Sequence, residues 1–257
     1  DPASITKVFS RYTATGQHTG GMLHFGPDGY LYVTSGDQSG NPQQLSTWGG
    51  KIFRIDVDGP DNIPGNADDD AFPADANNNY SIPADNPFVG RANVRPEIWS
   101  YGHRNLQGAA IHPVTGKLWT HEHGPKGGDE INIPAAGKNY GWPVVGYGID
   151  YSGQKLHDST GKAGMEPPVH YWVPSIAPSG MAFYTADRFP AWKGSLFVGA
   201  LAGQHLARLT LDGERVVAEE RLLGERNERI RDVRQGPDGY LYVLTDERNG
   251  KILRVSP

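Results

Sequence analysis

A nearly identical stretch of sequence occurs twice, near the two ends of the 257-residue chain. FGPDGYLYVTSGD at 25–37 recurs as QGPDGYLYVLTDE at 235–247. Each copy has a Pro-Asp-Gly turn followed by alternating Tyr, Leu, Tyr and Val, which is the pattern of a hairpin turn that leads into a strand. Weaker copies of such a turn and strand lie at 111–124 and 188–201. Four units spread along the chain favour a repeating array of small sheets.

A further strand is predicted after three of these units. Apolar and charged residues alternate in KIFRIDVDG (51–59), HLARLTLDG (205–213) and KILRVSP (251–257). Four units of turn, strand, loop and strand predict an all-β protein, a β-propeller with about four blades. A β-sandwich with similar hairpins is the alternative. Segments 134–138 and 217–223 are candidates for single helical turns.

The composition agrees with this fold class and excludes some functions. The 34 Gly and 20 Pro residues make up about a fifth of the chain, as expected for a turn-rich sheet protein. The net charge is −5 and no basic tract exists, which argues against a nucleic-acid partner. The sequence contains no run of about 18 apolar residues, so no membrane-spanning helix is predicted. The absence of cysteine excludes disulfides and thiolate chemistry.

The segment 58–88 differs from the rest of the chain, because it is rich in Asp, Asn and Pro and has almost no apolar periodicity. It is predicted to be an acidic surface loop inserted into a single domain that spans 1–257. The Asp cluster at 56–70 is a candidate Ca²⁺ site. It lacks the twelve-residue pattern ending in Glu that an EF-hand requires, so a solvated loop is favoured.

Two glycine-rich loops carry polar residues suited to ligand binding, and in a propeller such loops meet at the axis. His18 lies in GQHTGG, where flanking glycines permit close approach to a ligand, although a solvent-facing loop His fits this position equally well. Arg104, Asn105 and Gln107 lie in SYGHRNLQG. The planar fork of Arg suits carboxylates and anionic oxygens, and the alternative is a capped turn with a structural Arg.

Two further segments are candidates for cofactor or metal binding. In HEHGPKGGDEIN (121–132), acidic residues surround Gly124 and Pro125. A His-x-His pair hints at a transition metal, but backbone carbonyls with nearby acids suit Ca²⁺ better. In ERIRD, Arg229 and Arg231 lie on one face if the segment is a strand. They predict a ligand with several carboxylates, unless the neighbouring Glu228 and Asp232 neutralise them locally.

These motifs together resemble the soluble glucose/sorbosone dehydrogenase family, most closely its bacterial aldose sugar dehydrogenase branch, whose cofactor is pyrroloquinoline quinone. The matching stretches are GQHTGGMLHFGPDGYLYVTSGDQ, IWSYGHRNLQGAAIHPVTGKLW, HEHGPKGGDEINIPAAGKNYGWP, SGMAFY and RIRDVRQGPDGYLYVLTDE. They follow the order of the family and cover nearly the whole chain except 58–82. The resemblance implies a six-bladed propeller with the quinone across the top of its axis, and relative to it the chain is expected to be N-terminally incomplete.

The resemblance also implies roles for individual residues. The implied catalytic residues are His18 as general base, Asp37 as the group that orients it, and Arg104 as the group that stabilises a developing oxyanion. Quinone contacts are implied for Arg104, Asn105, Gln107, His123, Tyr140, Ser175, Arg229 and Arg231. A Ca²⁺ ion on the quinone is implied at the carbonyls of Gly124 and Pro125, and a second, structural Ca²⁺ at Tyr147, Asp150 and Glu166.

The implied activity is oxidation of the C1 hydroxyl of aldose sugars to aldonolactones by hydride transfer to the quinone, with Ca²⁺ as Lewis acid. An external electron acceptor and a periplasmic or secreted location follow from the same resemblance. The chain departs from the family at Ala202, which stands where a quinone-contacting Lys is expected. A non-catalytic carbohydrate- or protein-binding propeller is the alternative function, and a Ca²⁺-dependent lactonase is a third.

Overall fold

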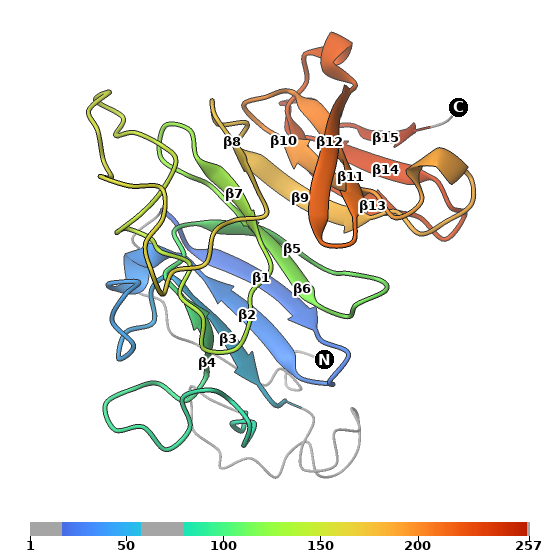
Figure 1. Cartoon of the computed structure of the whole chain (residues 1–257). Coiled ribbons are helices and arrows are strands. Elements are labelled where there is room, and N and C mark those ends of the chain that lie inside the picture. The colour runs from blue at the N-terminus through green and yellow to red at the C-terminus, as the bar shows by residue number, and fades with distance from the viewer. Residues whose placement is uncertain (1–16, 58–79, 256–257) are drawn as a thin grey trace.

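The computed structural model describes residues 17–57 and 80–255, which form four antiparallel sheets (Figure 1). Blade 1 contains β1 (Gly20–Phe25), β2 (Leu31–Ser35), β3 (Lys51–Ile55) and β4 (Ile98–Tyr101). Blade 2 contains β5 (Leu106–Ile111), β6 (Leu118–Glu122), β7 (Asp129–Asn132) and β8 (His170–Trp172). Blade 3 contains β9 (Pro178–Phe183), β10 (Leu196–Ala200), β11 (His205–Asp212) and β12 (Arg215–Leu222). Blade 4 contains β13 (Ile230–Gln235), β14 (Leu241–Thr245) and β15 (Ile252–Val255).

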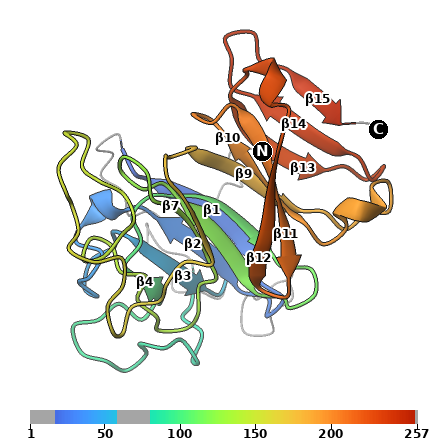
Figure 2. The same cartoon turned by 45° about the horizontal axis from the view of Figure 1, so that its top comes forward.

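The sheets are arranged as the blades of a β-propeller. Within each sheet the strands follow chain order, and the first strand of each blade contacts the first strand of the next, from β1 through β5 and β9 to β13. Figures 1 and 2 show the blades succeeding one another in chain order. The all-β propeller prediction is therefore confirmed, and the sandwich alternative is wrong.

The two strong sequence repeats occupy the same place in blades 1 and 4. Each Pro-Asp-Gly turn joins the first strand of its blade to the second. The Tyr32 hydroxyl donates to the carboxylate of Asp28 at 2.9 Å, and the Tyr242 hydroxyl donates to Asp238 at 2.7 Å. The weaker copies precede β6 and β10 in the same way. Each copy is a turn that leads into a strand, as predicted, and that strand is the second of its blade.

The remaining element predictions have mixed outcomes. The strands predicted after three of the repeats are β3, β11 and β15. The helical turn predicted at 217–223 is wrong, because most of this segment belongs to β12, where Glu220 pairs with Arg208 of β11 at 2.7 Å. The other candidate, 134–138, contains a turn and no helical residue. Short 3₁₀ helices occur at η2 (Asp37–Ser39), η3 (Pro190–Trp192) and η4 (Gly224–Arg226).

The predicted acidic loop falls between β3 and β4, and residues 58–79 of it lie outside the described residues. The described member of the Asp cluster at 56–70 is Asp56, which is buried and exchanges backbone hydrogen bonds with Ser81. The calcium hypothesis for this cluster, like the single-domain assignment of 1–257, stays a prediction. Within the described parts of the chain, no helix is long and apolar enough to cross a membrane.

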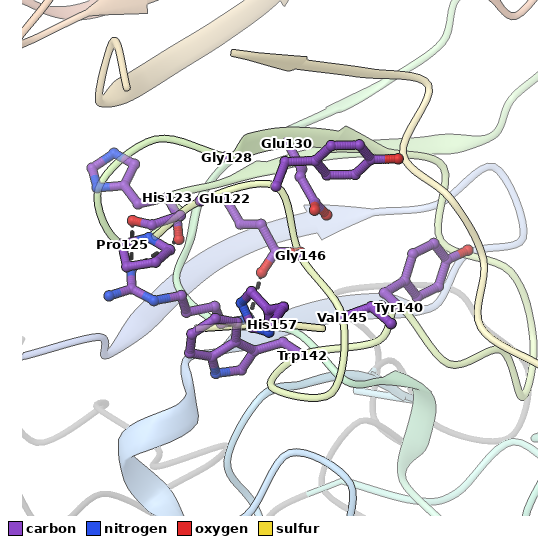
Figure 3. Close-up of a pocket in the computed structure, with 14 residues that line it drawn as sticks. Glu122, His123, Pro125, Gly128, Glu130, Tyr140, Trp142, Val145, Gly146 and His157 are labelled. Carbon is purple, nitrogen blue, oxygen red and sulfur yellow. Dashed lines mark hydrogen bonds between the residues drawn. The ribbon is translucent and has the colours of Figure 1, made fainter. Parts of the chain in front are cut away.

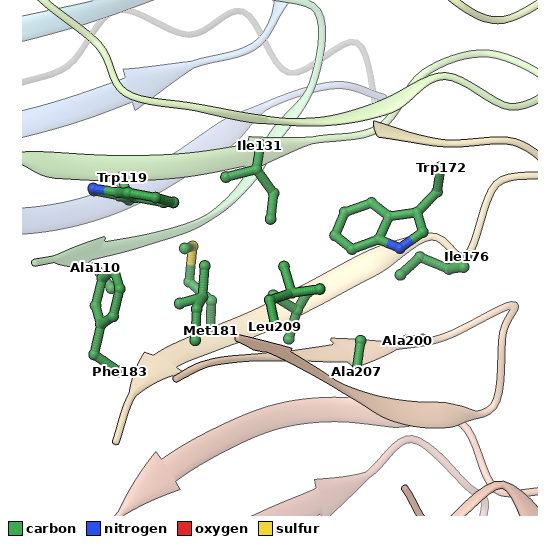
Figure 4. Close-up of a cluster of buried hydrophobic side chains, with 12 residues drawn as sticks. Ala110, Trp119, Ile131, Trp172, Ile176, Met181, Phe183, Ala200, Ala207 and Leu209 are labelled. Atoms are coloured by element: carbon green, nitrogen blue, oxygen red, sulfur yellow. The ribbon is translucent and has the colours of Figure 1, made fainter. Parts of the chain in front are cut away.

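Three of the four apolar clusters of the described residues lie between successive blades, as a propeller requires, and the fourth covers a face of blade 1. The largest cluster joins blades 2 and 3, where the rings of Trp119 and Phe183 meet edge to face with centroids 5.6 Å apart (Figure 4). Ile131 of blade 2 and Leu196 of blade 3 complete this contact and are fully buried. Burying such side chains contributes about 1.5–3 kcal/mol each. The apolar packing therefore fixes each blade against its neighbour, and with it the loops at the blade ends.

Every first strand carries a register shift close to its beginning. In β5, Leu106 and Gly108 pair with consecutive residues of β6, so that Gln107 is an extra residue. Arg231 is the extra residue at the same place in β13, and β1 and β9 show corresponding shifts against β2 and β10. A bulge bends the strand and re-aims its side chains. The repeated bulges therefore distinguish one end of the propeller from the other.

Candidate active site

The bulged end of the propeller collects most of the predicted site residues. The chain enters the first strands of the four blades through His18, Arg104 with Asn105, Ser175, and Arg229. It leaves the second strands of blades 1 and 2 through Asp37 and through His123 to Pro125. Because neighbouring strands are antiparallel, these entries and exits lie at the same end of the sheets. Residues up to 213 positions apart in the chain are thereby brought to one end of the fold, counted from His18 to Arg231.

His18 and Asp37 form a hydrogen-bonded pair at this end. The Nδ1 atom of His18 lies 2.7 Å from Oδ1 of Asp37, and the two side chains are 22% and 19% exposed. An ionised carboxylate only accepts hydrogen bonds, so Nδ1 carries the proton of this pair. The Nε2 atom then holds the lone pair, which is the arrangement of a general base. The pair predicted from the sequence is formed in the structure.

The backbone of His18 is held in place by close contact with Gly36. His18 has a positive φ of 50°, and the Gly36 amide donates to the Thr19 carbonyl at 3.3 Å. A Cβ atom on Gly36 would fall far inside contact distance of the His18 carbonyl oxygen. Glycine before Asp37 therefore allows the two halves of the pair to approach.

Replacing Gly36 by alanine is expected to displace the 17–20 segment and separate His18 from Asp37. The His18 carbonyl belongs to the backbone and cannot move aside as the end of a flexible side chain can. The strain therefore falls on the backbone of His18, whose φ is already positive. We expect a loss of activity of at least tenfold with blades that remain folded. The measurement is sugar-dependent dye reduction together with circular dichroism. Gly161→Ala is the matched control, because a Cβ there meets nothing within 4 Å and its φ is not positive. Equal losses in the two variants would contradict the expectation.

Arg104 links blades 1 and 2 beside this pair. Its Nη1 atom donates to the carbonyl oxygens of His123 and Gly124, both at 2.9 Å. Its amide donates to the Glu122 carboxylate, and its carbonyl accepts from the Asp37 amide at 2.8 Å. The side chain is buried, so the guanidinium charge is held in a fixed position. A fixed cation suits a developing or permanent negative charge on a ligand.

The turn at Gly124 and Pro125 is anchored by the buried carboxylate of Asp129. This carboxylate accepts from the Gly124 amide at 3.0 Å and from the amides of Ile176 and Ala177 at 2.8 and 3.0 Å. It also accepts from the Ser175 hydroxyl at 2.7 Å. The hydroxyl predicted to bind the cofactor thus has an internal partner. Asp129 ties the predicted carbonyl turn to the entry of blade 3.

The polar residues beside this turn are ordered by contacts with one another. The side-chain amide of Gln107 donates to Asn105 at 2.8 Å, and the Nε2 atom of His123 lies 2.6 Å from the Pro178 carbonyl. A carbonyl accepts, so Nε2 of His123 is the protonated nitrogen and Nδ1 is left as an acceptor. Burial lowers the pKa of His123, which favours this neutral form. His121 is fully buried, and burial lowers its pKa to about 3, which favours its neutral form.

Arg229 and Arg231 share a single carboxylate that the sequence did not reveal. Both guanidinium groups donate to Asp246, at 2.9 and 3.0 Å, and they lower the pKa of this residue. The predicted local partners are engaged elsewhere, since Glu228 pairs with Arg226 and Lys251, and Asp232 pairs with Arg234. Two guanidinium groups against one carboxylate leave a net positive charge. The common face expected for the two arginines is confirmed.

A pocket lies behind the Gly124–Pro125 turn (Figure 3). Arg104, Trp142 and Glu130 line it, and the Tyr140 ring closes one side. The Tyr140 hydroxyl donates to the Ile133 carbonyl at 2.7 Å, and burial raises its pKa. Burial, assisted by the neighbouring Glu122, raises the pKa of Glu130 to about 8. Protonated Glu130 is therefore the favoured form at neutral pH in the absence of a bound cation.

The raised pKa of Glu130 predicts a pH-dependent stability. The folded-state pKa of about 8 lies above the ordinary value of 4.5, so the folded chain binds an extra proton between these values. Stability is then full at low pH and falls as the pH rises towards 8. Each unit of pKa difference is worth about 1.4 kcal/mol, so the loss amounts to a few kcal/mol. Glu130→Gln should flatten this slope in urea unfolding at pH 5 and 8.5 with a chelator present. If the stability of the wild type and of Glu130→Gln changes equally with pH, Glu130 is not the cause of the pH dependence.

The residues implied for a structural Ca²⁺ have separate contacts. The ring of Tyr147 stacks on Tyr171 with centroids 4.0 Å apart, Asp150 accepts from the Ser152 amide, and Glu166 pairs with Lys138 at 2.9 Å. Within residues 17–57 and 80–255, no three His, Cys, Asp or Glu side chains are grouped as metal ligands. A calcium site here would thus depend on backbone carbonyls, and this assignment stays a prediction.

The sequence analysis missed Trp142 as a member of the site. Its indole N–H donates to Oδ2 of Asp37 at 2.7 Å, and its ring lies below the Arg104 guanidinium. Trp142 belongs to NYGWP, the end of a stretch that resembles the family, but the resemblance implied no role for this residue. A Trp in a glycine- and proline-flanked loop that ends a matching stretch was the available signal.

Comparison with known proteins establishes the family of this chain. Residues 3–79 and 74–254 match the Glucose / Sorbosone dehydrogenase family. The chain belongs to this family. It is 47% identical over 248 residues to the aldose sugar dehydrogenase YliI of Escherichia coli, covering 95% of this chain and 61% of that protein. A solved glucose dehydrogenase is 52% identical with a TM-score of 0.82, covering 94% of this chain and 65% of the other.

Another similar protein has been solved with PQQ bound. The aldose sugar dehydrogenase of Streptomyces coelicolor in its PQQ-bound form is 30% identical to this chain, with a TM-score of 0.65. The match covers 92% of this chain and 61% of the other. The chain thus spans 61% to 65% of the length of these three relatives. Ala202, where the family is expected to have a Lys, lies in the turn after β10 and donates its amide to Ile176.

Proposed function

We propose that this chain carries the catalytic base of an oxidoreductase that oxidises the C1 hydroxyl of aldose sugars to aldonolactones, with pyrroloquinoline quinone and Ca²⁺ as cofactors. The observation that carries the proposal is the His18–Asp37 pair at 2.7 Å beside the buried Arg104. A sugar hydroxyl needs a base to lose its proton while C1 loses hydride. The names of the E. coli and S. coelicolor relatives support a sugar substrate.

The side chains present fit an anionic quinone with a hard cation. Arg229 and Arg231 have one carboxylate between them, so they retain positive charge for ligand carboxylates. We assign the Ca²⁺ to the carbonyl oxygens of Gly124 and Pro125, because carbonyl oxygens are ligands that Ca²⁺ prefers; the Gly124 carbonyl also accepts from Arg104. We assign Asn105 and Gln107 to ligand contact, because they lie at the same blade entry as Arg104.

The chain itself contributes proton transfer and orientation. Nε2 of His18 accepts the proton of the C1 hydroxyl, and the carboxylate of Asp37 holds the ring and balances the charge that develops on it. The guanidinium of Arg104 stabilises negative charge on the reacting oxygen. When bound, the quinone with Ca²⁺ supplies the two-electron acceptor for the hydride of C1. The electrons then pass to an external acceptor, and we expect a periplasmic or secreted location.

The proposal is tested by adding the quinone and Ca²⁺ to the purified chain and following dye reduction with glucose and other aldoses. Quinone-dependent, sugar-dependent reduction is the expected result, and omission of sugar or quinone is the control. Sugar binding by calorimetry without any dye reduction would replace the proposal by the non-catalytic binding propeller. Hydrolysis of a lactone without quinone would replace it by the lactonase.

A further inference from the structure

Both oxygens of the Asp37 carboxylate are occupied by different partners. Oδ1 lies 2.7 Å from Nδ1 of His18, and Oδ2 accepts from the indole N–H of Trp142, also at 2.7 Å. A carboxylate with one oxygen bonded can turn about its Cβ–Cγ bond. A second bond from the far side fixes the plane of the carboxylate. The direction in which His18 is held is therefore set jointly by Asp37 and Trp142.

The same indole ring also contacts the catalytic cation. The guanidinium carbon of Arg104 lies 5.1 Å from the centre of the Trp142 ring, within the range of a cation–π contact. His157 meets the ring from another side, edge to face, with centroids 5.3 Å apart. The Trp142 side chain thus contacts both Asp37 of blade 1, which is the partner of His18, and Arg104 at the entry of blade 2.

The position of Trp142 is built into the surrounding loops. Its amide donates to the Gly102 carbonyl at 2.8 Å, and its carbonyl accepts from the side-chain amide of Gln43 at 2.7 Å. Gln43 and Asn139 exchange hydrogen bonds at 3.0 and 2.8 Å, which joins the loop after Asp37 to the loop before Trp142. The indole is thus placed by a network that spans 105 residues between Asp37 and Trp142.

We propose that Trp142 is a positioning residue of the proton-abstracting pair: its indole N–H fixes the Asp37 carboxylate, and its ring holds Arg104, so that His18 and Arg104 face one substrate. This inference rests on the proposed function, because it assigns His18 the role of base. Loss of the N–H frees the carboxylate and lets His18 leave its productive direction. In metal sites, the partners that orient a ligating histidine are typically worth about 10- to 100-fold in activity, and we expect an effect at the lower end of that range here.

The kinetic test uses Trp142→Phe, which keeps an aromatic ring beside Arg104 and removes the N–H. We expect kcat to fall about tenfold while KM for the sugar changes less than about twofold, because the change acts on proton transfer. Trp99→Phe is the matched control, since Trp99 lies in β4 and its indole N–H donates to the Pro134 carbonyl of blade 2, away from Asp37. An unchanged kcat in Trp142→Phe overturns the inference. An inactive wild type overturns the proposed function instead.

A second test needs no cofactor. In protein labelled with ¹⁵N-tryptophan, the indole signal that Trp142→Phe removes belongs to Trp142. We expect this signal to move in Asp37→Asn, and also in His18→Gln, because His18 and Trp142 share one carboxylate. The Trp99 signal should stay in place in both variants. A Trp142 signal indifferent to Asp37→Asn overturns the inference, whatever the activity of the chain.

Discussion

Replacing His18 by glutamine is expected to lower kcat/KM for aldoses by roughly 10²–10⁴-fold, the usual contribution of a general base. Glutamine keeps a polar side chain in the loop but has no nitrogen that accepts a proton near neutral pH. The substrate hydroxyl then has to lose its proton to water. The measurement is quinone-dependent dye reduction at saturating quinone and Ca²⁺, with folding checked by circular dichroism.

Two companion variants separate loss of the base from general damage. His24→Gln alters a partly buried histidine of β1, the strand that follows His18, and should leave kcat/KM close to wild type because His24 lies outside the blade entry. Asp37→Asn keeps the shape of the partner of the base and removes its charge, so we expect a loss that is large but smaller than that of His18→Gln. If His18→Gln retains wild-type kcat/KM, the base is another group and the mechanism proposed above is wrong.

The fold could be predicted from the sequence because short local patterns specify its turns and strands. In the segment 25–37 and in its copy at 235–247, the Asp of the turn accepts a hydrogen bond from a Tyr of the next strand. The same residues therefore make the same contact in both blades. Each copy is the second strand of a blade, and the period of the blades could be counted from it. Strand β12 was misjudged because its alternation is broken by adjacent charges, which contact other strands: Glu220 pairs with Arg208 of β11, and Glu219 lies against His170 of β8.

The candidate site was predicted less completely, because its contacts join distant residues. His18 and Asp37 are 19 residues apart and lie within one stretch that resembles the family, so the resemblance placed them together. Trp142 lies 105 residues from Asp37, and no local pattern connects the two. Asp246 was missed as the partner of Arg229 and Arg231 for the same reason. It ends the second strand of blade 4, and only the antiparallel pairing with β13 brings it opposite the arginines.

Asp129 was noticed in the sequence as an acid near the Gly-Pro turn, and its structural position predicts the largest loss of stability. Its side chain is fully buried and accepts from the backbone amides of Gly124, Ile176 and Ala177 and from the Ser175 hydroxyl. Asp129→Ala leaves these donors facing a cavity. Each unsatisfied buried donor costs about 1–3 kcal/mol, so we expect the free energy of unfolding to fall by about 3–5 kcal/mol.

The expected loss is measured by urea unfolding of Asp129→Ala beside a surface control. Asp187→Ala removes an exposed carboxylate that pairs only with Lys193 at the surface, so its effect should stay below about 1 kcal/mol. Asp129→Asn retains one acceptor oxygen and should fall between the two. Asp129 also joins the Gly124–Pro125 turn of blade 2 to the entry of blade 3. In Asp129→Ala we therefore expect activity to be lost at a lower urea concentration than that of global unfolding. If Asp129→Ala unfolds like Asp187→Ala, the carboxylate is not the anchor of this end of the propeller.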